Sequence, residues 1–180
     1  MGTAGRFTQE KLVIGVLGAP SADRGRLCAL LEARWGPIDL ATPPMPFTFT
    51  GYYDGEMGTP IDRFFLAFER LVDPAGLARI KLETNGIEDL FRVGGLRKVN
   101  LDPGLLSLPR FVLATTKENA HRIPLSDGIY AEVTLLYGRE GFHPLPWTYP
   151  DYRSEAYRAV LDGLRARYKE QLRERRSSGG

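Results

Sequence analysis

The sequence is short of the residues that staple small domains, with one cysteine, Cys28, and two histidines, His121 and His143, among 180 residues. A disulfide framework needs paired cysteines, and a zinc finger needs four Cys or His ligands, so both classes are excluded. A chain of this length buries roughly 70% of its unfolded surface, so its core needs no such support. Site chemistry is therefore left largely to carboxylates, lysines and His121.

The sequence also has no long apolar run and no strong charge of one sign. The apolar segment 12–19 is shorter than the roughly 20 residues of a transmembrane helix and short for the core of a signal peptide, so we expect a cytoplasmic protein and no membrane. The 24 basic and 22 acidic residues give a net charge of +2, which excludes a strongly basic nucleic-acid-binding domain. Residues 153–176, however, include eight basic side chains and only four acidic ones.

Four motifs of nucleotide-binding and hydrolytic sites are absent. The segment 16–21, which follows the first apolar run, lacks the Gly-Lys-Ser/Thr that ends a P-loop, and no Gly-x-Gly-x-x-Gly follows it. The sequence contains no Gly-x-Ser-x-Gly nucleophile elbow and no His-Glu-x-x-His zinc motif. Any active site in this chain must therefore be built in another way.

The hydrophobic patterns that are present predict a single α+β domain with a mixed or mostly antiparallel sheet and about three main helices. We expect a disordered N-terminus at 1–9, the domain at 10–174 and a flexible tail at 175–180, with a turn at Pro103-Gly104. The opening strand–helix–strand and a second one around 63–102 indicate a ferredoxin-like half. The predicted strands are 11–17, 45–50, 64–71, 97–102, 111–116 and 129–137, and the predicted helices are 24–35, 74–91 and 153–174.

Three of the predicted strands each carry a polar face. If these strands are neighbours, the faces form one surface with two carboxylates, which suit Mg²⁺, and with lysines, which suit phosphate. The solvent-facing side of an antiparallel sheet is polar as well, so both interpretations stay open. The polar faces comprise Lys98, Asn100 and Asp102; Thr115 and Lys117; and Tyr130, Glu132 and Thr134.

Two kinds of loop adjoin these faces. The dense polar run 115–122 follows a buried strand and contains His121, a candidate general acid or base, and Arg122. Aromatic residues gather at 52–56 and 147–153. Their rings are suited either to stacking on a base or to capping the core.

Six runs of the chain have a distinctive sequence: GPIDL (36–40), PFTFTGYYDGEMG (46–58), VNLDPGLL (99–106), LATTKENAHRI (113–123), GIYAEVTLLY (128–137) and PLPWTYPDYRSEAY (144–157). In this order they resemble an uncharacterised prokaryotic family, domain of unknown function 4416. The resemblance spans roughly residues 10–172 and implies no activity, although members are sometimes labelled GTP-binding proteins. This sequence has neither the P-loop nor the Asn-Lys-x-Asp motif on which that label rests.

The leading functional hypothesis is a metal-assisted enzyme that acts on a phosphorylated small molecule or a nucleotide. Its catalytic residues are Asp102, Lys117, His121 and Glu132, with Asp102 and Glu132 holding a divalent cation such as Mg²⁺. The predicted ligand-binding residues are Tyr53, Glu56, Lys98, Asn100, Thr115 and Arg122. The alternative is an RNA- or protein-binding module that uses the aromatic loops and the basic C-terminal helix, and a third option is a structural part of a larger assembly.

Overall fold

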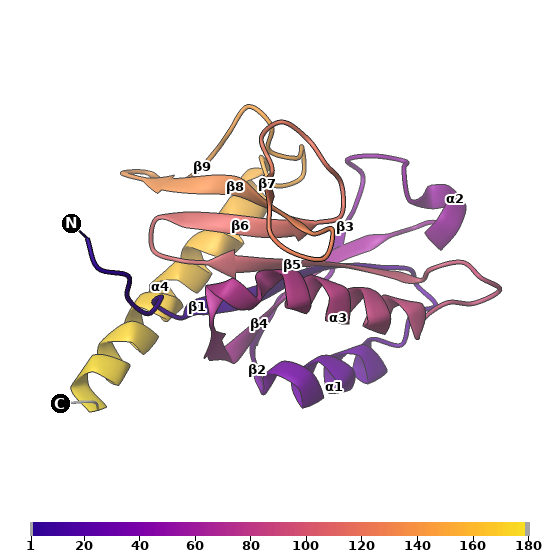
Figure 1. The fold of residues 1–180 in the computed structure, drawn as a ribbon. Coiled ribbons are helices and arrows are strands. Elements are labelled where there is room, and N and C mark those ends of the chain that lie inside the picture. The colour runs from indigo at the N-terminus through magenta and orange to yellow at the C-terminus, as the bar shows by residue number, and fades with distance from the viewer. Residues whose placement is uncertain (1, 179–180) are drawn as a thin grey trace.

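One antiparallel sheet runs through the computed structural model of the protein, which describes residues 2–178 (Figure 1). Within these residues nine strands follow the order β2-β4-β1-β5-β6-β8-β7, with β3 added to β4 and β9 to β8. The strand pairs within residues 2–178 are antiparallel, which agrees with the predicted mixed or mostly antiparallel sheet. The strands are β1 (Glu10–Gly18), β2 (Ile38–Ala41), β3 (Met45–Pro46), β4 (Asp62–Val72), β5 (Val99–Leu106), β6 (Arg110–Thr115), β7 (Ile123–Pro124), β8 (Tyr130–Gly138) and β9 (Gly141–Pro144).

Three long helices confirm the predicted number of main helices. They are α1 (Arg24–Trp35), α3 (Leu77–Asp89) and α4 (Glu155–Ser178). The chain also contains the one-turn helix α2 (Asp54–Met57) and the 3₁₀ turn η1 (Pro74–Gly76). Asp23 caps α1 by accepting a hydrogen bond from the Arg26 N–H at 2.9 Å. Helix α4 continues into the segment expected to be a tail, whose residues 179–180 lie outside the described part of the chain, as does Met1.

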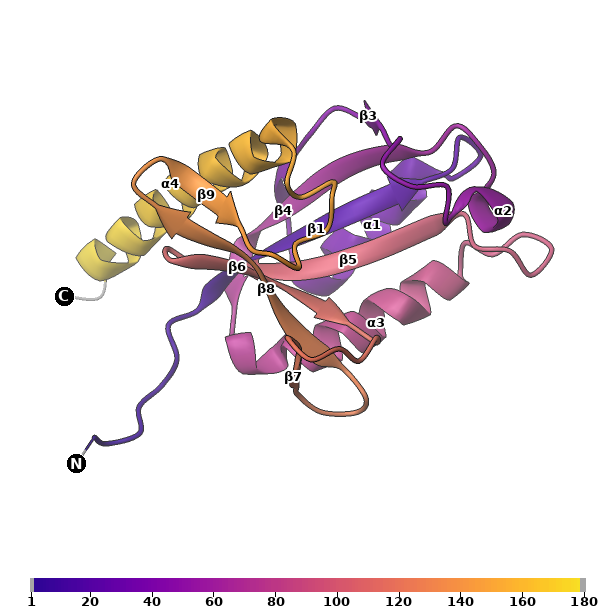
Figure 2. The ribbon, with the colours of Figure 1, turned by 90° about the horizontal axis from the view of Figure 1, so that it is seen from above.

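The first half of the chain is ferredoxin-like. The segment β1–α1–β2–β4–α3–β5 forms two split βαβ units with the strand order β2-β4-β1-β5. Helices α1 and α3 cover one face of the sheet and α4 crosses the other (Figures 1 and 2). Both faces of β1 are therefore buried, which is why its sequence is a continuous apolar run.

Two sequence-based predictions of local structure are wrong, one of a turn and one of the length of a strand. Pro103 and Gly104 do not form a turn but lie inside β5, opposite Ile14 and Val13 of β1. Gly104 is needed there because a Cβ would lie 2.5 Å from the Phe111 ring. The expected strand at 45–50 stops at Pro46, since the aromatic side chains that follow pack instead against Tyr53 and Tyr157.

The three polar strands are neighbours in the sheet. Gly104 of β5 pairs with Leu113 of β6, which pairs with Glu132 of β8, so Asp102 and Glu132 lie on the same face. An irregularity in the β6–β8 register then moves Leu135 to the α4 side, although the alternation predicts that it shares a face with Val133. No helix within residues 2–178 is long and apolar enough to cross a membrane.

Candidate functional site: a polar pocket where two strands separate

The site begins where β5 and β6 part. Their ladder joins only Gly104–Leu106 to Phe111–Leu113, and beyond it the strands diverge above α3 (Figure 2). The edge of β5 is completed there by α3, because the Leu101 N–H donates to Glu88 Oε1 at 2.8 Å and the Leu101 carbonyl accepts from Lys81 Nζ at 2.8 Å. The buried side chains of Lys81 and Glu88 thus replace a neighbouring strand.

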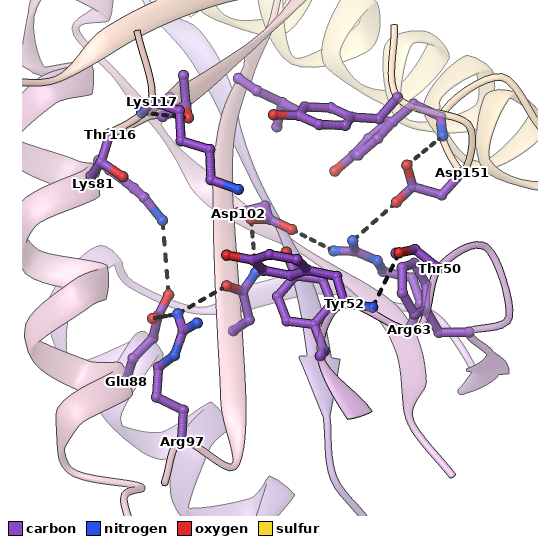
Figure 3. Close-up of a pocket in the computed structure, with 18 of the residues that line it drawn as sticks. Thr50, Tyr52, Arg63, Lys81, Glu88, Arg97, Asp102, Thr116, Lys117 and Asp151 are labelled. Carbon is purple, nitrogen blue, oxygen red and sulfur yellow. Dashed lines mark hydrogen bonds and ion pairs between the residues drawn. The ribbon is translucent and has the colours of Figure 1, made fainter. Parts of the chain in front are cut away.

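A pocket of about 860 Å³ occupies this opening (Figure 3). Its volume lies within the roughly 300–1,000 Å³ of small-molecule sites. Its walls come from the loop after β3, from β4, α3, β5 and β6, and from the loop before α4. The lining includes the aromatic residues Phe47, Phe49, Tyr52, Tyr53, Tyr149 and Tyr152 and the charged residues Arg63, Lys81, Glu88, Asp89, Arg92, Arg97, Asp102, Lys117, Glu132 and Asp151.

Arg63 of β4 organises one wall of the pocket. Its Nη1 lies 2.9 Å from Asp102 Oδ2 and its Nη2 lies 3.1 Å from Asp151 Oδ2 (Figure 3). Burial alone would raise the pKa of Asp102, but the charges of Arg63 and Lys81 and a hydrogen bond from Asn100 hold it below its usual value. Because 26% of its side chain is exposed, Asp102 presents a charged carboxylate to the pocket at neutral pH.

Arg97 organises the wall beside α3. It forms two hydrogen bonds of 2.8 Å to Glu56 and one of 3.1 Å to Glu88. The hydrogen bonds from Arg97 lower the pKa of Glu56, whereas burial raises the pKa of Glu88. Glu56 therefore acts on the pocket through Arg97, and Lys98 donates to the Glu56 carbonyl at 3.4 Å.

Glu132 of β8 also lines the pocket and is fully buried. Its Oε2 lies 2.8 Å from Arg122 Nε and 3.0 Å from His121 Nε2. Arg122 also donates to the Lys117 carbonyl at 2.7 Å and to the Tyr149 hydroxyl at 2.6 Å. One guanidinium thus holds three residues of the pocket wall.

The structure brings the ten predicted site residues together, in two layers. Those that line the pocket are Tyr53, Asn100, Asp102, Thr115, Lys117 and Glu132. Glu56, Lys98, His121 and Arg122 are not among the lining residues. Each of these four binds a lining residue or a partner of one.

The predicted metal ligands, Asp102 and Glu132, both line the pocket, and each is bound to an arginine. Residues 2–178 contain no group of three or more His, Cys, Asp or Glu side chains that could hold a metal ion. The two carboxylates alone therefore do not form a preassembled metal centre. His121 is also committed, since its ring pairs with Glu132 and stacks on Trp147 at a centroid distance of 5.1 Å.

Sequence reasoning missed several charged residues of the pocket. Lys81 and Glu88 carry a usable signal, because a spacing of seven places them on the same face of a helix. The signal at Arg63 is weaker: alternation along β4 places this charged residue on the same face as the apolar residues Phe65 and Ala67. No local pattern connects Asp151 with Arg63, because 88 residues separate them in sequence.

Two of the basic residues of α4, Arg165 and Arg167, hold that helix on the sheet. Arg165 donates to the Leu108 carbonyl at 2.7 Å, and its guanidinium carbon lies 3.4 Å from the centre of the Tyr137 ring. Arg167 pairs with Asp39 at 2.9 Å. These contacts use charges on which an RNA-binding surface would depend.

Comparison with protein families gives one match. A family model described as a domain of unknown function, DUF4416, matches residues 8–168. No curated protein and no solved structure matches the chain.

Proposed function

The chain belongs to the DUF4416 family, whose description assigns no activity, and we propose from the pocket itself that the protein binds a phosphorylated small molecule or a nucleotide. The observation that carries the proposal is the state of Lys117. Five cationic side chains line the pocket. Among the described residues, Lys117 is the one of the five that has no carboxylate partner.

The surroundings of Lys117 suit an oxyanion. Its side chain points into the pocket, and its ammonium lies 4.7 Å from the centre of the Tyr52 ring (Figure 3). The backbone N–H of Lys117 donates to Thr115 Oγ1 at 3.2 Å, which fixes the backbone where the loop after β6 begins. Thr50 and Thr116, which also carry hydroxyl groups, line the same pocket. A lysine ammonium is a common phosphate-binding group in proteins.

The aromatic lining supports a ligand that also has a planar or apolar part. Tyr52 and Tyr53 form an edge-to-face pair with a centroid distance of 5.0 Å, and 66% of Tyr52 is exposed. An exposed ring beside a free ammonium offers a stacking surface next to a charge.

The proposal extends to metal-assisted chemistry on the bound phosphate. Mg²⁺ at such sites is commonly held by one or two carboxylates together with phosphate oxygens and water. Asp102 is suited to supply a carboxylate, because it is partly exposed and its pKa is lowered. In this scheme the cation enters with the ligand, and Lys117 neutralises the phosphate.

The test is a thermal-shift and calorimetric comparison with and without Mg²⁺. The probes are inorganic phosphate, ribose 5-phosphate and nucleoside 5′-monophosphates. A probe at 100 times its dissociation constant stabilises the protein by about 2.7 kcal/mol, which corresponds to a shift of roughly 5–10 °C for a chain of this size. We expect Lys117→Met to weaken binding by about tenfold or more, because a charged hydrogen bond contributes about 1.5–3 kcal/mol.

The matched control is Lys169→Met, at an exposed lysine of α4 away from the pocket. It should bind the probes as the wild type does. Failure of every probe to bind, or equal binding by Lys117→Met and the wild type, contradicts the proposal. A gain in affinity on adding Mg²⁺ that Asp102→Asn abolishes supports the metal-assisted scheme, and affinity independent of Mg²⁺ contradicts that scheme alone.

A further inference from the structure

Glu132, which lines the pocket, specifies more about the ligand than a phosphate. We infer that the ligand is a nucleotide whose base carries an exocyclic amino group, and that this amino group donates a hydrogen bond to Glu132 Oε1. The inference rests on the proposed function, because it concerns the same pocket.

Glu132 Oε1 is a buried acceptor that lacks a donor. Both protein partners of this carboxylate, Arg122 and His121, bind Oε2. Oε1 has no hydrogen-bond partner among the described residues, and only 1% of the side chain is exposed. A buried acceptor left without a donor destabilises a protein. Since Glu132 lines the pocket, a bound ligand can supply the donor.

The donor that fits is a neutral amine. The guanidinium of Arg122 already balances the charge of Glu132 at 2.8 Å. A second full cation is therefore not required, and the free oxygen needs one N–H directed at it. A bare divalent cation fits this position poorly. Arg122 occupies one oxygen of Glu132, and the single oxygen that remains does not provide the several oxygen ligands that Mg²⁺ prefers.

The walls around Glu132 favour a flat group that carries this amine. Leu113 and Ala114 of β6 line the pocket there, together with Tyr149 and Pro150. The Tyr149 hydroxyl is held by Arg122 at 2.6 Å, so the ring is fixed beside the carboxylate. A nucleobase combines apolar faces with polar edges, and an aromatic side chain can stack on such a face.

The phosphate and base subsites are linked through one side chain. Arg122 binds Glu132 Oε2 through Nε and the Lys117 carbonyl through Nη1. The amine acceptor and the free ammonium therefore lie in one pocket and are connected through Arg122. One molecule with an amino-bearing base and a phosphate satisfies both groups at once.

The experiment measures dissociation constants for two matched pairs of 5′-monophosphates, adenosine against purine riboside and guanosine against inosine, with ribose 5-phosphate as the base-free reference. The members of each pair differ by one exocyclic amine. We expect the amine-bearing member of at least one pair to bind the wild type about tenfold or more tightly than its partner. In Glu132→Gln, which presents an amide in place of the carboxylate, this preference should disappear. In the matched control Glu118→Gln, at an exposed glutamate of the adjoining loop, it should persist.

The wild-type measurement is decisive without any variant. If both pairs bind with equal affinity, or ribose 5-phosphate binds as tightly as the nucleotides, the inference is overturned while phosphate binding through Lys117 stands. Retention of the amine preference by Glu132→Gln overturns the role of Glu132. If none of the phosphates binds, the proposed function and the inference fail together.

Discussion

Gly15 leaves the space through which Arg63 reaches its two carboxylates. In the register of the sheet Gly15 lies between Phe65 of β4 and Asp102 of β5. A Cβ on Gly15 would lie 2.8 Å from Arg63 Nη1 and 2.8 Å from the Tyr152 hydroxyl. The buried ion pairs of the pocket wall therefore depend on a residue without a side chain in β1.

Gly15→Ala should destabilise the protein by about 1–3 kcal/mol, because an added methyl group must displace a buried, charged side chain. Urea denaturation measures this loss, and under the proposed function the affinity for the phosphorylated probes should fall with it. The control is Gly163→Ala in α4, where no atom lies within 4 Å of an added Cβ. That change should stabilise the helix by up to about 1 kcal/mol. Equal stabilities of the two variants would contradict this account of Gly15.

Helix α3 substitutes for a strand at the open side of β5. A separated strand edge exposes unpaired N–H and C=O groups, which destabilise a buried region unless they find partners. Lys81 and Glu88 supply these partners to Leu101, and the Nζ of Lys81 lies 3.8 Å from Glu88 Oε1. The pocket can stay open because the helix satisfies the backbone that β6 leaves behind.

Glu88→Ala should destabilise the protein by about 3 kcal/mol and speed hydrogen exchange at the Leu101 amide. The substitution removes the acceptor of that amide and leaves Lys81 and Arg97 short of a buried counter-charge. Amide exchange followed by NMR measures the local effect. Asp89→Ala is the control, because its carboxylate is 62% exposed and its ion pair within residues 2–178 is with a neighbouring arginine on the surface. Unchanged exchange at Leu101 in Glu88→Ala would show that α3 does not protect this strand.

At the scale of the whole molecule, α4 and the loop before it close the second face of the sheet with buried tyrosines. Burial raises the pKa of Tyr157 to about 12, and it raises the pKa values of Tyr53 and Tyr152 as well. An unfolded chain ionises its tyrosines near pH 10. Between these values the folded state retains protons that the unfolded state releases, so the free energy of unfolding falls as pH rises.

The contribution of these tyrosines to the free energy of unfolding should therefore be complete below about pH 10. Above that pH it should decline by about 1.4 kcal/mol per pH unit for each such tyrosine. Tyr157→Phe removes one ionising group, so its stability curve should be flatter than that of the wild type between about pH 10 and 12. Urea denaturation at stepped pH values measures both slopes, and the difference at pH 7 serves as the reference. Parallel curves for the two proteins would contradict the burial of this hydroxyl.

Local sequence patterns by themselves determined the ferredoxin-like half, the three long helices and the polar faces of β5, β6 and β8. Periodicity reports which residues share a face of one element, and Asp23 marks a helix start through a bond within its own turn. The polar strands 97–102, 111–116 and 129–137 were found in this way, and six of the ten predicted site residues line the pocket.

Only the tertiary structure decided how these faces meet. The parting of β5 from β6, the crossing of Arg63 over Gly15 and the pairing of Arg63 with Asp151 depend on register and on contacts between distant segments. The same is true of Glu132, whose alternation shows a polar face but not which of its two oxygens stays without a partner. Such features arise because a pocket is formed by several elements at once, whereas a sequence pattern describes one element at a time.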